Sequence, residues 1–122
     1  MSIIKERPMY LEPKLCHRFL IEIPNSNVDS WAFQNFKIYT EGEDLLFETN
    51  LLDFIPSKIN PVELLKTKKV IISFLDPTGE VVNKYSFNIK GVFYELNGDY
   101  GKDELLTHKL KMQILEETFK QY

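Results

Sequence analysis

The chain has 122 residues, 43% hydrophobic and 27% charged, a composition that predicts one globular domain with a modest core. Fifteen Lys and Arg against eighteen Asp and Glu leave a formal net charge of −3, which argues against the basic surface that general nucleic-acid binding requires. The single cysteine, Cys16, excludes an intrachain disulfide and a cysteine-based zinc cluster. Without a hydrophobic signal core or an apolar run of roughly 18 residues, we expect a soluble protein made in the cytoplasm.

The start of the chain shows no clear hydrophobic period. It combines charges with Pro8 and Pro13, and proline disfavours both helix interiors and central strands. We expect residues 1–14 to form an N-terminal arm, either a disordered tail or a segment ordered only by a partner. Residues 15–122 are predicted to form a single β domain.

Three strands are predicted in the first half of the domain, at 15–23, 31–40 and 45–52. The first shows strict alternation of apolar residues, a period of two that is typical of a half-buried strand. The second is rich in aromatic residues, and strict alternation predicts Phe36 on one face and Phe33 on the other.

A short helix and a hairpin are predicted next. Asn60 followed by Pro61 marks a helix start, because Asn is a good N-cap and Pro suits the first helical position. The segment 69–88 predicts a hairpin with the turn Asp76-Pro77-Thr78-Gly79. Pro presets φ at the first central position of a type I turn, and Gly tolerates the left-handed conformation at the fourth.

The rest of the chain also predicts strands. Gly91 is expected to break or bend the return strand, after which "VFYEL" continues as a further strand. A loop at 97–104 leads to a last strand at 106–114, where apolar and polar residues alternate. The predicted fold is therefore mainly β: an antiparallel two-sheet β-barrel or sandwich with one short helix.

The sequence shows no constellation of catalytic residues. Cys16 and His17 are adjacent, so on a strand they point to opposite faces and cannot act as nucleophile and base. His108 lies in the apolar row of the last strand, where a structural role outweighs a role as base or ligand. The acidic loop at 97–104 lacks EF-hand spacing, and the glycines form no phosphate-binding motif. We predict no enzymatic activity and no cofactor or metal.

The order of these features resembles a known family. "RFLIEIP" precedes the aromatic strand "WAFQNFKIY", and the hairpin "VIISFLDPTGEVVNKYSF" is followed by "KGVFYELNGDYGKDELLTHKLKMQI". This pattern resembles the tail tube proteins of phages with contractile tails and their relatives in type VI secretion and other contractile injection machines. The resemblance implies a two-sheet barrel with a flanking helix. Six copies would form a ring whose inner sheets join into one continuous barrel, and the rings would stack into a hollow tube.

This resemblance implies two sets of functional residues. Exposed strand edges would pair with neighbouring copies. We expect the hairpin and the last strand to supply the assembly interface, through Val70, Ile72, Phe74, Tyr85, Phe87, Leu110 and Met112. DNA must slide through the lumen without being gripped by basic groups, so an acidic or neutral lining is expected. The carboxylates predicted to face the lumen are Glu41, Glu43, Asp44 and Glu48.

The function implied is that of a structural virion protein, the self-assembling subunit of the inner tail tube that conducts DNA. Its expected partners are further copies in stacked hexameric rings, a tail sheath protein, and baseplate or tube-initiator proteins. DNA would pass transiently, with no stable nucleic-acid complex and no membrane insertion. The expected location is the phage tail, after assembly in the host cytoplasm. A specialised end ring, or a subunit of a bacterial injection device, fits the same pattern.

Two other classes of function remain as alternatives. The first is a monomeric small β-barrel that binds a ligand or peptide in an aromatic-lined pocket. The second is a metal-dependent enzyme that uses His17, His108 and nearby carboxylates. Assembly at high concentration distinguishes the tube subunit from the first alternative, and insensitivity to chelation would argue against the second.

Overall fold

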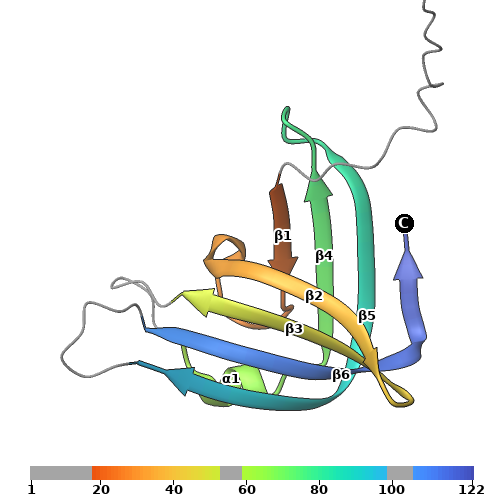
Figure 1. The fold of residues 1–122 in the computed structure, drawn as a ribbon. Helices are drawn as coiled ribbons and strands as arrows, with labels where there is room; N and C mark the ends of the chain where they lie inside the picture. The colour runs from red at the N-terminus through yellow and green to blue at the C-terminus, as the bar shows by residue number, and fades with distance from the viewer. Residues whose placement is uncertain (1–17, 53–58, 99–105) are drawn as a thin grey trace, which may run out of the picture.

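The computed structural model describes residues 18–52, 59–98 and 106–122, and the predicted arm at 1–14, Cys16 and His17 lie outside these ranges. The described residues contain six strands, one α-helix and one 3₁₀ turn (Figure 1). The strands are β1 Arg18–Glu22, β2 Phe33–Glu41, β3 Asp44–Leu52, β4 Lys69–Leu75, β5 Val81–Asn97 and β6 Thr107–Gln121. The helices are η2 Ser30–Ala32 and α1 Pro61–Leu65.

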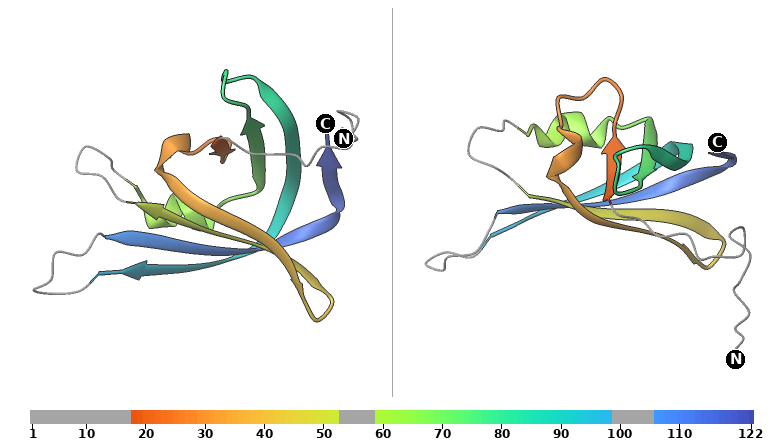
Figure 2. Two further views of the ribbon diagram at one scale, coloured as in Figure 1. Left: turned by 45° about the horizontal axis from the view of Figure 1, so that its top comes forward. Right: turned by 90° about the horizontal axis from the view of Figure 1, so that it is seen from above.

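The six strands form one antiparallel sheet in the order β1-β4-β5-β6-β3-β2. This sheet curls on itself, so that β1, β4, the first half of β5 and the end of β6 stand upright while the rest crosses below them (Figures 1 and 2). We call the crossing part, made of β2, β3, residues 107–113 of β6 and residues 91–97 of β5, the panel. Residues 91–97 of β5 are called β5C. The predicted mainly β, antiparallel fold with one short helix is confirmed. Its two layers are halves of a single sheet that forms a half-barrel.

The bend between the two halves lies at Gly91. Pairing with β6 shifts between Ile89 and Gly91, because one extra residue, Lys90, is inserted in β5 at this point. A Cβ atom at Gly91 would lie 2.8 Å from Oε1 of Gln113. The predicted bend is therefore present, although β5 continues through it as one strand.

A second irregularity lies opposite, in β6. Ser86 pairs with Lys120 and Asn88 with Leu115, so four residues of β6 lie opposite a single residue of β5 between these pairs. Thr118 fills the interruption: its Oγ1 accepts a hydrogen bond from the Asn88 N–H (2.8 Å) and donates one to the Leu115 carbonyl (2.6 Å). This side-chain bridge lets β6 continue to Gln121, beyond the predicted end at residue 114.

The local signals at the helix and the hairpin turn are confirmed. Asn60 Oδ1 accepts the Val62 N–H at 2.9 Å, which caps α1. In the turn, the Gly79 N–H donates to the Asp76 carbonyl (2.9 Å), and Gly79 has φ of 88°. The Thr78 hydroxyl, with the Glu80 amide, holds the pKa of the Asp76 carboxyl below its ordinary value.

One prediction about β2, the assignment of Phe33 and Phe36 to opposite faces, is wrong. Phe33 and Phe36 were expected on opposite faces of β2, yet Phe33 is buried in the core and Phe36 packs against the same core. The cause is a register shift between Phe33 and Asn35, where one extra residue reverses the alternation. The prediction assumed an unbroken period of two.

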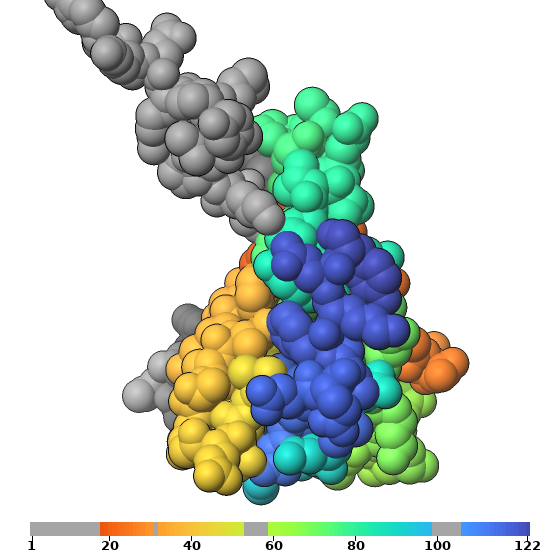
Figure 3. All heavy atoms as spheres, turned by 90° about the vertical axis from the view of Figure 1, so that its right-hand side faces the viewer, coloured from red at the N-terminus to blue at the C-terminus, as the bar shows by residue number. Residues whose placement is uncertain are grey.

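The core fills the space between the upright strands and the panel. Its buried side chains come from every strand and from α1, which contributes Leu64. The edge strands β1 and β2 meet through rings, with the centroids of Phe19 and Phe36 5.0 Å apart. In the space-filling view the β4–β5 hairpin rises above the rest of the domain, and β6 fills the surface beside the β2–β3 hairpin (Figure 3). Aromatic packing between Phe19 and Phe36 therefore links β1 to β2 at one point of the half-barrel.

Candidate assembly surface

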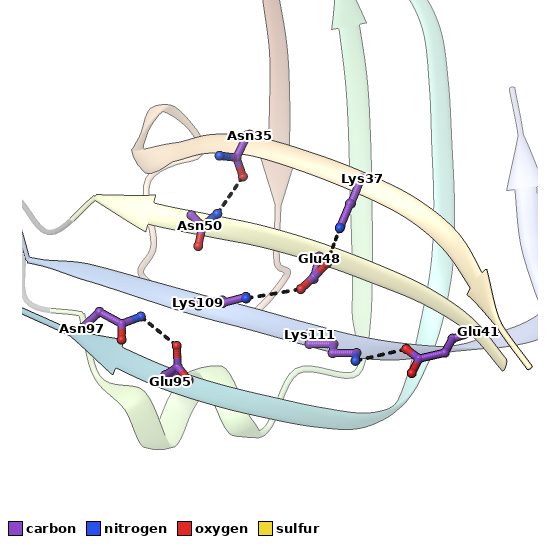
Figure 4. A network of polar contacts seen from close by, with 9 residues as sticks. All are labelled: Asn35, Lys37, Glu41, Glu48, Asn50, Glu95, Asn97, Lys109 and Lys111. Carbon is purple, nitrogen blue, oxygen red and sulfur yellow. Dashed lines mark hydrogen bonds and ion pairs between the residues drawn. The ribbon is translucent and has the colours of Figure 1, made fainter.

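The panel has one face against the core and one face directed outward, and the outward face is mainly polar. Alternation along the four strands places lysines, glutamates and amides on it in transverse rows. Nine of these side chains are drawn in Figure 4: Asn35, Lys37, Glu41, Glu48, Asn50, Glu95, Asn97, Lys109 and Lys111. Three lysines face three glutamates, and Asp44 at the end of the panel adds one carboxylate, so this face is close to neutral.

Ion pairs connect the strands across this face. Glu48 lies between two lysines, with Lys37 Nζ at 3.1 Å from its Oε2 and Lys109 Nζ at 3.6 Å from its Oε1. Lys111 Nζ lies 3.2 Å from Oε2 of Glu41 (Figure 4). The panel therefore neutralises its own charges by pairing them across neighbouring strands.

Two of these pairs shift pKa values. Partial burial opposes ionisation of Glu48, whose side chain is 14% exposed, but its bond to Lys37, the Tyr39 hydroxyl and the charge of Lys109 hold its pKa below the ordinary value. The hydrogen bond and charge of Glu41 raise the pKa of Lys111. Each shift favours the charged form in the folded chain.

Amide side chains extend the same network toward the other end of the panel. The Asn50 amide donates to Oδ1 of Asn35 at 3.0 Å, across β3 and β2. The Asn97 amide donates to Oε2 of Glu95 at 2.9 Å, within β5C. Two shallow polar grooves cross this surface, both bordered by Glu48 and Lys109.

The carboxylates predicted to face the lumen all lie at this panel. Glu41 and Glu48 point from its outward face, where each is paired with lysine. Glu43 and Asp44 are exposed at the turn that joins β2 to β3, where Gly42 has φ of 63°. The structure thus brings the four residues to one surface, and their placement along a lumen stays a prediction. The lysines beside them could not be inferred from the carboxylate-rich turn alone.

The predicted assembly residues do not lie on the outward face of the panel. Phe74 and Tyr85 are half-buried, with ring centroids 5.7 Å apart. The other five are at most 1% exposed and belong to the core of the chain itself: Val70, Ile72, Phe87, Leu110 and Met112. Their side chains are covered in this structure, so any contact with another chain would fall to other parts of these strands. Alternation reveals a buried face without saying whether the same chain or a second copy buries it.

The structure also reveals two open strand edges on the panel. Among the described residues, β2 pairs only with β3, and β5C pairs only with β6. Each edge presents backbone N–H and C=O groups on its other side, which can pair with a further strand. Sequence analysis missed both edges, because strand order depends on pairing between distant segments.

Exposed apolar side chains gather beside the β5C edge. Helix α1 packs against β5. The segment that follows α1 is bonded to β5 as well, because the Ile89 N–H donates to the Lys68 carbonyl at 2.8 Å. Of the eight large apolar side chains exposed among the described residues, half belong to β5C or α1: Phe93 (59% exposed), Leu96 (51%), Val62 (53%) and Leu65 (49%). Such a concentration is typical of a surface that another molecule covers.

The remaining candidate residue that the structure describes, His108, has a structural partner. His108 is 2% exposed and its Nδ1 hydrogen-bonds the Tyr94 hydroxyl. Among the residues that the structure describes, no three His, Cys, Asp or Glu side chains gather in an arrangement that could hold a metal ion. The described part of the chain also contains no helix of the length and apolarity needed to cross a bilayer.

No protein-family model matches the chain, and no curated protein matches it. Solved structures share this fold, among them the following three. All three are components of contractile injection systems.

The first is the six-fold symmetrised baseplate of the anti-feeding prophage, 13% identical, with a TM-score of 0.54 over 91% of this chain and 96% of that chain. The second is the tube-terminating cap of the same particle, 13% identical, with a TM-score of 0.55 over 100% and 94%. The third is the sheath/tube terminator of the extracellular contractile injection system PVC in its extended state, 12% identical, with a TM-score of 0.54 over 91% and 97%. At these identities the likeness is one of fold.

Proposed function

We propose that this chain is a structural, non-enzymatic subunit of a contractile tail or injection device, and that it forms rings by joining panels edge to edge. The observation that carries the proposal is the pair of open edges, β2 and β5C, at opposite sides of a four-stranded panel. The described fold, shared with parts of contractile injection systems, supports the same assignment.

The strand directions suit such a joint. Successive strands of the panel are antiparallel, and because there are four of them, β2 and β5C run in opposite directions. A β2 edge docked on the β5C edge of the next copy therefore continues the antiparallel alternation. The two edges differ, so the contact is head-to-tail and closes into a ring when the rotation per copy divides a full turn. We propose six copies, in keeping with the six-fold symmetry described for the baseplate neighbour.

In this ring the outward face of the panel lines the lumen. Three lysines there are paired with or opposed by three glutamates, so the lining is close to neutral. A near-neutral wall suits passage of a polyanion such as DNA, because tight phosphate binding needs unpaired cationic groups. The proposed location is the inner tube of the particle, in contact with sheath, baseplate and tube-initiator proteins. The neighbours come from a cap, a terminator and a baseplate, so the proposal includes the end rings of the tube.

The test is negative-stain electron microscopy with light scattering at rising protein concentration. Rings or hollow tubes are expected. Phe93→Lys should abolish them, since it places a charge on the β5C edge at a side chain that is 59% exposed. Val82→Lys is the matched control, an apolar residue of similar exposure (52%) on the upright part of β5. A monomer at every concentration would overturn the proposal and favour the ligand-binding or peptide-binding barrel.

A further inference from the structure

We propose that the two edges meet in one register, in which Lys37 of one copy faces Glu95 of the next and Tyr39 faces Phe93. This inference rests on the proposed edge-to-edge assembly and adds the residue pairs that hold it together. It follows from the side chains that each edge presents. On the outward face β2 carries Asn35, Lys37, Tyr39 and Glu41, and β5C carries Gly91, Phe93, Glu95 and Asn97.

Alternation limits the possible registers. Sliding one edge by a single residue would bring the polar face of one panel against the apolar face of the other. Only slides by two residues keep the faces continuous, so the choice falls among a few pairings. In an antiparallel ladder, each choice fixes every other pair along both edges.

The two edges are complementary in the register that places Lys37 opposite Glu95. It brings opposite charges together and places the ring of Tyr39 opposite the ring of Phe93, both favourable cross-strand pairs. The same register places Asn35 opposite Asn97. It also leaves Glu41 opposite Gly91, beside the polar Gln113 side chain that lies over the glycine. Each outward position thus meets a compatible partner.

The core-facing side chains of the two edges agree with this register. When Lys37 lies opposite Glu95, Phe36 lies opposite Leu96, Ile38 opposite Tyr94, and Thr40 opposite Val92. Phe36 is half-buried and Leu96 is 51% exposed in the single chain. Pairing them would remove apolar surface from water on the side where α1 leaves Val62 and Leu65 exposed.

The neighbouring registers lack this agreement. A slide of two residues one way places Lys37 opposite Phe93 and Asn35 opposite Glu95, so the two charges are separated. A slide the other way places Tyr39 opposite Glu95 and Glu41 opposite Phe93, which sets carboxylates against aromatic faces that are electronegative. The proposed register is the one that satisfies both charge and apolar pairing.

Charges then alternate without interruption across the joint. Within one panel Lys111 lies opposite Glu48, which lies opposite Lys37. In the next copy Glu95 lies opposite Lys109. The joined row therefore runs Lys111, Glu48, Lys37, Glu95, Lys109, so that every carboxylate has a lysine on each side. Lys37 is 66% exposed, which leaves its ammonium room to lie between Glu48 and Glu95.

Disulfide trapping tests the register. In a Cys16→Ser background, Lys37→Cys with Glu95→Cys is compared with two control pairs, Lys37→Cys with Phe93→Cys and Lys37→Cys with Asn97→Cys. Within one chain β3 and β6 separate β2 from β5C. Three strand spacings, about 14 Å, exceed the reach of a disulfide, so each crosslink must join two copies. All four replaced side chains are exposed, and folding of each variant is checked by thermal melting.

After mild oxidation, the 37/95 pair should give a ladder of covalent oligomers on a non-reducing gel, several-fold stronger than either control pair. A stronger ladder from a control pair would overturn the register while leaving edge-to-edge assembly in place. Monomer bands from all three pairs would overturn both the register and edge-to-edge assembly. As a second measurement, Glu95→Lys should reduce assembly and Lys37→Glu in the same chain should restore it. Failure of that rescue would also count against the pair.

Discussion

The two faces of the panel are made by alternate residues of the same strands, but they depend on different forces. On the core side Phe47 and Leu110 are completely buried. On the outward side Lys37 is 66% exposed and Phe93 59% exposed. Burial makes the first face sensitive to any loss of volume or gain of charge, because packed interiors do not relax freely. Exposed ion pairs contribute little to folding, so the second face can be altered with little loss of stability.

The largest contrast between the faces should come from adjacent residues on β6. Leu110→Asp or Met112→Asp places a carboxylate in the core and should prevent folding, because a buried unpaired charge is among the most destabilising changes. Leu110→Ala should lower the free energy of unfolding by about 2–5 kcal/mol. Lys111→Asp, one residue away on the outward face, is the control and should fold. Circular dichroism and urea unfolding measure all four, and a folded Leu110→Asp variant would contradict the arrangement of the core.

A smaller effect is expected where a polar group supports the core face indirectly. Asn60→Ala removes the cap of α1, the helix that delivers Leu64 to the core, and should cost about 1 kcal/mol in urea unfolding. Asn50→Ala makes the same chemical change on the outward face, where the amide bonds Asn35. Its cost should be clearly smaller. Equal costs at the two positions would show that α1 does not contribute to the core as described.

Glu48→Gln should destabilise the protein at neutral pH by about 1 kcal/mol at most, since its two ion pairs are on the surface. The folded-state pKa of Glu48 is lowered, so its contribution is present above the unfolded-state pKa and is lost as the pH falls through the folded-state pKa. Wild type and variant should therefore differ at about pH 7 and converge as the solution is acidified to about pH 3. A difference that persists in acid would mean that the carboxylate charge is not responsible.

The smallest effect is expected from Lys111→Gln. Its ion pair with Glu41 is exposed, and its pKa is raised by that carboxylate, so any contribution is present at neutral pH and is lost only as the pH rises through the folded-state pKa. Melting temperatures of wild type and variant at neutral pH should agree within error. A marked loss of stability would show that the outward face supports the fold more than its exposure implies.

Local signals in the sequence were enough to predict several elements. The cap at Asn60 and the turn at Asp76–Gly79 involve residues within a few positions of one another, so their chemistry is visible in a short segment. The alternation in β1 and β6 likewise indicated strands where strands occur. What could be predicted is therefore the type of most elements and the mainly β fold.

Features that depend on distant partners could not be predicted. The extra residue before Asn35 moves Phe33 into the core, and the bulge bridged by Thr118 extends β6 past the end of its simple alternation. The same limit applies to the candidate surface. Strand order decides that β2 and β5C are open edges and that Leu110 is covered by the chain itself, and no single segment contains that order.

The course of β5 and β6 has a mechanical consequence. Both strands pass through the bend, so that the end of β6 pairs with the upright part of β5 while its beginning lies in the panel. Two separate sheets stacked face to face could slide over one another by shearing side-chain contacts. Here the two halves belong to one bent sheet, so a force applied to one half is transmitted to the other through the covalent backbone and the hydrogen bonds between strands. Relative slip would require rupture of those bonds, so the domain should resist shear as a single stiff body.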